Sequence, residues 1–175
     1  MRKRPAVQWL FLCICVLMAA CGPSGSKAPV AQNPVLVGSP ARAPASLELG
    51  VAVPNDSPML TFTDWYGSEK SHRWSKGKTS SIGFSVPRSS LGARNIVLVG
   101  APHGPQRLRL LLNGKPLATT QLKPTKAFQE FVFSLPSGDL REGINTLQLE
   151  TPDAKRAGPK DPRVISFALV SFILR

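Results

Sequence analysis

The sequence predicts an all-β protein: an antiparallel β-sandwich, jelly-roll-like, with about eight or nine strands. Three observations predict this fold. Short segments of alternating apolar residues recur across residues 47–175, and these segments are bounded by Gly, Pro, Asn or Asp. No window has the apolar period of a long amphipathic helix. Two facing sheets of this length bury a core without disulfides.

Alternation and the residues that interrupt it define the predicted strands. Residues 107–112 alternate most plainly, because Leu108, Leu110 and Leu112 share one face and two arginines fall on the other. The nine predicted strands are, in chain order, residues 47–53, 59–63, 81–86, 95–99, 107–112, 117–122, 131–135, 144–150 and 164–174.

Local features refine this pattern. Asn113-Gly114 separates two predicted strands and is the strongest two-residue hairpin signal, because both residues accept positive φ. In residues 164–174 the apolar phase slips near the end, which predicts a β-bulge or a strand buried on both faces. Residues 91–94 and 137–141 are each predicted to form one helical turn.

Residues 155–160 predict a solvated basic loop, and residues 161–163 predict a turn with a local pair of Asp161 and Arg163. Asn145 is expected to bond the backbone at a strand edge.

All three cysteines, Cys13, Cys15 and Cys21, lie in the first 21 residues. The rest of the chain therefore has no disulfide, no Cys-ligated metal site and no Cys nucleophile. The two histidines, His72 and His103, cannot by themselves form a His-rich metal site. No cofactor and no metal ion are expected.

The N-terminal segment predicts export. Residues 2–4 are basic, residues 9–18 form an apolar run of 10 residues, and Ala19-Ala20 follows. A membrane-spanning helix needs about 20 apolar residues. A basic start, a short apolar core and small residues indicate a signal peptide at residues 1–20.

Met18-Ala19-Ala20-Cys21 resembles the lipobox of bacterial lipoproteins, although Met18 stands where Leu is usual. The resemblance implies that Cys21 carries a diacylglyceryl thioether and, after cleavage, an acylated N-terminus. Several acyl chains, palmitate among them, would then anchor the protein stably to a membrane. Gly22 in place of Asp implies the outer membrane of the cell envelope, again by resemblance. An ordinary secretory peptide and an uncleaved anchor helix remain the alternatives.

Residues 21–46 form a lipidated-Cys and Pro/Gly/Ser-rich tether, and residues 47–175 form the β-sandwich domain. The net charge falls from +12 to +9 when residues 1–20 leave, because they hold three basic and no acidic residues. Such a charge suits nucleic acid. Export and a membrane tether argue against a nucleic-acid partner.

Residues 64–75 carry the densest chemistry, with two of the three Trp, the only Tyr and one His. Polar residues and Gly bracket this segment, which predicts a loop, and loops on a rigid β-scaffold often carry binding sites. Aromatic faces stack on the C–H surfaces of sugars, while polar groups bond their hydroxyls. The candidate ligand-binding residues are Trp65, Tyr66, Glu69, His72, Arg73 and Trp74.

The same residues also fit a structural role. Trp65 and Trp74 would then cap the open end of the sandwich, with Arg73 paired to Glu69 or Asp64. The sequence leaves both interpretations open.

Five segments carry a further resemblance. They are WYGSE at 65–69, RWSKG at 73–77, RLLLNG at 109–114, LREGIN at 140–145 and DPR at 161–163. Together they resemble the β-sandwich accessory domains of envelope glycosyltransferases and phosphoglycerol-transferase-like proteins. The resemblance implies a jelly-roll fold and a link to surface polysaccharide.

Enzyme chemistry finds little support. The sequence has no recognisable Ser elbow, no phosphate-binding Gly loop and no clearly opposed carboxylate pair. The sequence therefore predicts a non-catalytic outer-membrane lipoprotein that binds cell-envelope glycan or exopolysaccharide. The alternative is a protein-interaction accessory lipoprotein of a secretion, pilus or polysaccharide-export assembly.

Overall fold

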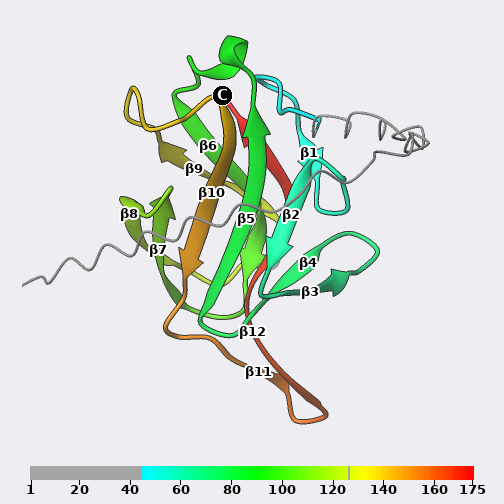
Figure 1. Ribbon diagram of the computed structural model, residues 1–175. Coiled ribbons are helices and arrows are strands. Elements are labelled where there is room, and N and C mark those ends of the chain that lie inside the picture. Colours follow the sequence, from blue (N-terminus) through cyan, green and yellow to red (C-terminus); the bar gives the residue numbers. More distant parts are fainter. Residues whose placement is uncertain (1–44, 126) are drawn as a thin grey trace, which may run out of the picture. The chain divides into compact units, whose positions relative to one another are not determined.

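The computed structural model of the protein describes residues 45–125 and 127–175 and confirms the predicted all-β sandwich (Figure 1). Twelve strands in these residues form two antiparallel sheets. Within the described part, no helix has the length and hydropathy needed to cross a bilayer. The signal peptide, Cys21 and nearly all of the tether lie outside the described residues, so those assignments stay predictions.

Sheet A is organised around its longest strand, β12 (Asp161–Leu174). Its main path runs β3 (Trp65–Ser68), β4 (Arg73–Lys76), β12, β6 (Asn95–Pro102) and β9 (Gln129–Ser134). Two short strands, β1 (Val53–Pro54) and β11 (Lys155–Gly158), also pair with β12.

Sheet B packs its inner face against that of sheet A. Its strands run in the order β2 (Leu60–Thr63), β5 (Thr79–Val86), β10 (Gly143–Glu150), β7 (Gln106–Leu112) and β8 (Lys115–Leu122). One short 3₁₀ turn, η1 (Arg88–Ser90), follows β5.

The core lies between the two sheets and is built from alternate residues of nearly every strand. The predicted face of β7 is confirmed, since Leu108, Leu110 and Leu112 are at most 1% exposed. Phe84 of sheet B meets Phe172 of sheet A with ring centroids 4.8 Å apart. Apolar burial of this kind contributes about 25 cal/mol per Å² and holds the two sheets together without a disulfide.

The predicted Asn-Gly hairpin joins β7 to β8. Asn113 and Gly114 have φ values of 52° and 81°, the positive values that the short turn requires. The Asn113 amide also ties the turn to β10: Nδ2 donates to Oδ1 of Asn145 at 2.9 Å, and Oδ1 accepts from the Thr146 N–H at 3.0 Å. Asn145 itself is buried and bonds neighbouring backbone groups, as its sequence context suggests.

The predicted phase slip in β12 is confirmed as a pair of register shifts. One lies between Ile165 and Ala168 against β4, and one between Leu169 and Ser171 against β6. The shifts turn Phe167, Leu169, Phe172 and Leu174 all toward the core, which uninterrupted alternation would forbid.

Three expectations are corrected near the ends of the predicted elements. Residues 47–53 do not form one continuous strand, because Gly50 takes a φ of 75°: Leu49 makes an isolated bridge with Leu174, and Val53 alone belongs to a strand, β1. The helical turn expected at residues 91–94 lies earlier, in η1. Residues 137–141 contain no helical turn.

The strand β11 is an addition that the sequence did not predict. Its residues are basic and lack apolar alternation, so they suggest a solvated loop. Pairing with the start of β12 turns them into a strand: Lys155 faces Ile165 and Arg156 faces Val164. Pairing with the backbone of β12, and not the pattern of its own side chains, therefore makes β11 a strand.

We expect Gly100→Ala to lower the free energy of unfolding by roughly 2 kcal/mol, because a methyl group there forces the packed strands apart. A Cβ on Gly100 would collide with the carbonyl oxygen of Ala168 and lie 2.7 Å from Cζ of Phe167. Urea denaturation of the purified domain measures the change. Gly92→Ala is the matched control, since nothing lies within 4 Å of its Cβ position. Equal stability of the two variants would contradict the close packing of β6 on β12.

Candidate functional site

Residues 64–75 form a β-hairpin at the edge of sheet A, and the loop predicted there is wrong. Trp65 of β3 pairs with Ser75 of β4, and a bulge separates this pair from Ser68 and Arg73. The turn closes where the Glu69 N–H donates to the carbonyl of His72 at 2.8 Å. An edge strand exposes polar side chains along its length, so its composition resembles that of a loop.

Alternation along this hairpin divides the six candidate residues between two faces of the sheet. Trp65 faces the interior and packs on the core, where its Nε1–H donates to the carbonyl of Ser81 at 3.0 Å. Its ring meets that of Phe62, a residue of sheet B, with centroids 5.5 Å apart. Trp65 thus closes the open edge between the two sheets, which fits the structural interpretation of this residue.

Arg73 also faces inward, and its predicted pairing with Glu69 or Asp64 is wrong. Its guanidinium lies 4.3 Å from the ring centroid of Phe62 and donates to the backbone carbonyls of Asn55 and Tyr66 at 3.2 and 3.0 Å. These contacts join two strands of sheet A, the turn before β2 and the inner face of sheet B. The side chain therefore holds the hairpin in place.

The outer face of the hairpin carries the aromatic surface. Trp74 is half-buried and lies edge-on to two histidines: its ring centroid is 5.2 Å from that of His72 and 5.8 Å from that of His103. His72 in turn lies 5.5 Å from Phe128, whose side chain is 45% exposed. We call these four side chains, Phe128, His72, Trp74 and His103, the aromatic row.

Small residues lie under the aromatic row. Trp74 pairs in register with Ala168 of β12, and Ala168 pairs with Ala101 of β6. Phe128 precedes β9, on the far side of these two strands, yet its ring reaches His72. The rings therefore cross above the two alanines, and Ala168 is fully covered.

The sequence did not predict two members of the row, His103 and Phe128. They lie in the turn after β6 and in the segment before β9, and the sheet order alone brings them to the hairpin. Neither has a neighbouring residue pattern that would single it out. A histidine between Pro and Gly and a phenylalanine next to a lysine-rich stretch both resemble ordinary loop residues.

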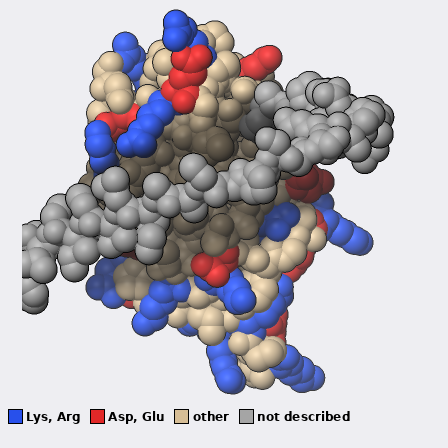
Figure 2. Space-filling model, viewed as in Figure 1, with Lys and Arg blue, Asp and Glu red and all other residues tan. Residues whose placement is uncertain are grey.

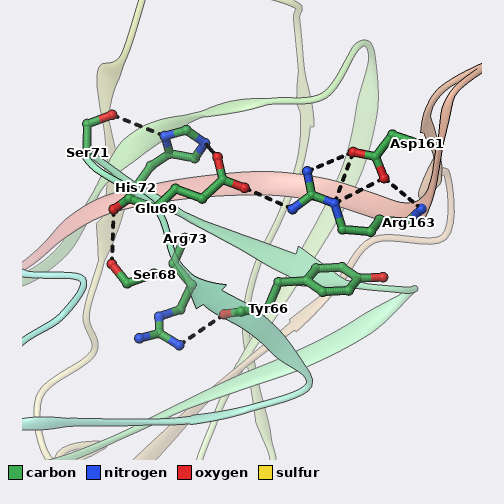
Figure 3. A network of polar contacts seen from close by, with 8 residues as sticks. All are labelled: Tyr66, Ser68, Glu69, Ser71, His72, Arg73, Asp161 and Arg163. Carbon is green, nitrogen blue, oxygen red and sulfur yellow. Dashed lines mark hydrogen bonds and ion pairs between the residues drawn. The ribbon is translucent and has the colours of Figure 1, made fainter.

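A chain of polar contacts fixes the turn of the hairpin (Figure 3). Glu69 accepts a hydrogen bond from Arg163 at 2.8 Å, and Arg163 makes a forked contact with Asp161. The Asp161–Arg163 pair expected from the sequence is thus confirmed. Hydrogen bonds from Arg163 lower the pKa of Asp161, and these two carboxylates raise the pKa of Arg163.

His72 and Tyr66 flank this chain of contacts. Oγ of Ser71 lies 3.1 Å from Nδ1 of His72, within hydrogen-bond distance. Nε2 of His72 lies 3.3 Å from Oε2 of Glu69 without hydrogen-bond geometry, so this contact is an ion pair only when the imidazole is protonated. Arg163 stands 5.4 Å from the ring centroid of Tyr66. The rings of His72 and Tyr66 are both half-buried, so part of each contacts solvent.

The outer face of sheet B offers a different environment. A hollow of about 400 Å³ lies there between Lys78, Arg107, Arg109 and Glu150. Arg109 pairs with Glu150 at 3.1 Å, and Arg107 forks onto Asp153, whose pKa it lowers to about 2. No aromatic ring lines this hollow, so it has no stacking surface.

The described residues contain no group of three or more His, Cys, Asp or Glu side chains arranged to hold a metal ion. Each of the two histidines of the row lies edge-on to the ring of Trp74. The chemistry available at this surface is therefore ring stacking, hydrogen bonding and charge.

Comparison with known proteins gives structural likeness only. No protein-family model matches the chain, and no curated protein matches it. A CBM35 module from Paenibacillus barcinonensis is similar with 14% identity and a TM-score of 0.49, over 72% of this chain and 98% of that one. A family 35 carbohydrate-binding module from Clostridium thermocellum is similar with 13% identity and a TM-score of 0.40. That match covers 69% of this chain and 97% of the other.

A third similar structure is an arabinoxylan arabinofuranohydrolase of glycoside hydrolase family 43 from Bacillus subtilis, in complex with cellotetraose. Its identity is 13% and its TM-score 0.46, and the match covers 74% of this chain and 28% of that chain. At such identities the surface residues of this protein have to be assessed from their own geometry.

We expect Trp65→Ala and Trp74→Ala to differ in stability. Trp65→Ala removes a core contact and the hydrogen bond to Ser81, so the free energy of unfolding should fall by about 2–3 kcal/mol. Trp74→Ala removes a ring from the outer face and should lower it by about 1 kcal/mol or less. Urea unfolding followed by circular dichroism gives both values. The reverse order would show that Trp74, rather than Trp65, closes the sandwich.

Proposed function

We propose that this protein is a non-catalytic lipoprotein of the outer membrane whose β-sandwich binds glycan of the cell envelope or an exopolysaccharide. The aromatic row carries the proposal. Rings on the solvent side of a sheet contribute little to the core, and Phe128 exposes 45% of its surface. Partly exposed rings gathered in one place are typical of binding surfaces.

The form of the row suits a sugar chain. Its members lie on one face with centroids 5.2 to 5.8 Å apart, a spacing of the order of one pyranose residue. Each ring offers an apolar surface to the C–H groups of a sugar. Strand β4 holds Trp74 in place, and the hydrogen bond between the Glu69 N–H and the His72 carbonyl holds the turn that carries His72, so little conformational entropy is lost when a glycan binds.

Polar groups beside the row can bond sugar hydroxyls. Ser71 and Tyr66 flank the outer side of the hairpin, and Glu69 lies within its turn. Because the carboxylate of Glu69 is held by Arg163, it is already oriented before a ligand arrives. Pre-oriented acceptors of this kind confer orientation and specificity at carbohydrate-sized sites.

We expect Trp74→Ala and Phe128→Ala each to weaken glycan binding roughly five- to thirtyfold, since an aromatic ring in such a contact contributes about 1–2 kcal/mol. A glycan array identifies ligands of the soluble domain, and isothermal titration calorimetry measures their affinity. Unchanged circular dichroism spectra establish that the variants remain folded.

Ile144→Ala is the matched control, because Ile144 is 73% exposed but lies on sheet B. It should leave glycan affinity unchanged. Full binding by folded Trp74→Ala and Phe128→Ala proteins, or no glycan binding by the wild type, would refute the proposal.

A second candidate function is docking of a protein partner, as in an export, pilus or secretion assembly. One observation favours it: Ile144 and Met59 expose apolar side chains around a shallow hollow of about 100 Å³ on sheet B. Crosslinking in the native envelope tests this candidate. A stoichiometric protein partner lost on Ile144→Ala, with no dependence on glycan, would favour it over glycan binding.

The membrane anchor has its own test. We expect Cys21→Ala to abolish labelling by radioactive palmitate and to move the protein from the membrane fraction to the soluble fraction, because only lipid on Cys21 anchors it. Cys13→Ala is the control and should label normally. Labelling that survives Cys21→Ala would contradict the lipobox assignment.

A further inference from the structure

Lysines extend the aromatic row at one end. Lys76 lies two residues after Trp74 on β4, so both side chains leave the same face, about 7 Å apart along the strand. In register, Lys76 and Lys155 flank Ile165 from either side of β12. Ile165 lies outside the core cluster yet is 2% exposed, as expected where long lysine stems cover an apolar neighbour.

Lys155 also approaches the row through the turn after β6. A Cβ on Gly104 would lie 2.5 Å from Nζ of Lys155, so the ammonium group sits beside the residue that follows His103. His103 in turn contacts Trp74. The ammonium group of Lys155 and the side chain of Lys76, which leaves the same face as Trp74, thus border the end of the row that Trp74 and His103 form.

The surrounding charges leave these lysines uncompensated. Among the described residues, neither Lys76 nor Lys155 forms an ion pair, and the same holds for Lys78, Arg156 and Lys160 at this end of the sandwich. The nearby carboxylates of Asp153 and Asp161 are each held by an arginine. In Figure 2, Lys and Arg side chains gather around the tip formed by β11 and the start of β12.

We infer that the glycan bound at the aromatic row is an acidic polysaccharide, with a carboxylate near Lys76 and Lys155 while a sugar ring stacks on Trp74. This inference rests on the proposed function. Charge complementarity selects the partner, because two unpaired ammonium groups beside an aromatic surface attract an anion that also carries an apolar face.

The geometry favours a polymer over a membrane surface as the source of the anion. Leu47 bonds the far end of β5, and Leu49 meets the far end of β12. The described chain thus enters at the end of the sandwich opposite the lysines. A domain attached by its N-terminal side would direct the lysines away from its attachment point.

The test compares polymers that differ only in charge. Polygalacturonate and alginate, each with its carboxyl-reduced neutral form, serve as probes for the full-length lipoprotein in detergent. We expect at least tenfold tighter binding to the carboxylated forms, with a preference that falls as salt rises. The double variant Lys76→Gln/Lys155→Gln should lose about tenfold toward the acidic polymers and little toward the neutral ones.

Arg94→Gln/Arg141→Gln is the control of equal charge change, since both arginines are exposed, lack an ion pair in the described residues and lie at the opposite end. An equal loss of affinity for the acidic polymers in this control would overturn the inference, because the attraction would then depend on the net charge of the protein and not on Lys76 and Lys155. Equal binding of acidic and neutral forms would overturn it as well, yet leave glycan binding standing. Lysine-dependent binding to phosphatidylglycerol vesicles and to neither acidic polymer would replace the polysaccharide with a membrane. Binding to no polymer and no array glycan would refute the proposed function itself.

Discussion

The pairing of β12 is the interaction on which the rest of the structure depends. This 14-residue strand bonds β4 and β1 along one edge and β6 and β11 along the other, so one segment near the C-terminus organises all of sheet A. Its two register shifts allow Phe167 and Phe172 to reach the core although an odd interval separates them. They also leave Ala168 facing outward, where a larger side chain would displace the Trp74 ring above it.

Alternation in the β3–β4 hairpin separates stability from surface chemistry. Inward-facing Trp65 and Arg73 meet at Phe62 and join the two sheets at their open edge, so the hairpin has a fixed position. Outward-facing His72 and Trp74 are held in place by the same hairpin, although they do not contribute to the core. The structural interpretation therefore applies to the inward-facing residues of this hairpin, and the ligand contact that we propose belongs to its outward-facing residues.

Much of the fold could be predicted from the sequence because apolar alternation is local. Leu108, Leu110 and Leu112 mark their strand unaided, and Asn113-Gly114 marks its turn. The candidate site was harder to predict from the sequence. Its polar hairpin resembled a loop, and the sheet order brings His103 and Phe128 to it from distant parts of the chain. Contacts between residues so far apart in the chain leave no local pattern in a single sequence. The contact between Asp161 and Arg163 could be predicted because the two residues are only two positions apart.

The bulge in β3 has a consequence for self-association. Sheet edges present free N–H and C=O groups that invite a strand from a second copy. At this edge only four residues are extended, and the bulge between Trp65 and Ser68 interrupts their ladder. A neighbouring molecule therefore meets no continuous row of backbone groups at this edge. The partly exposed rings of the aromatic row can thus lie near a sheet edge without promoting edge-to-edge aggregation there.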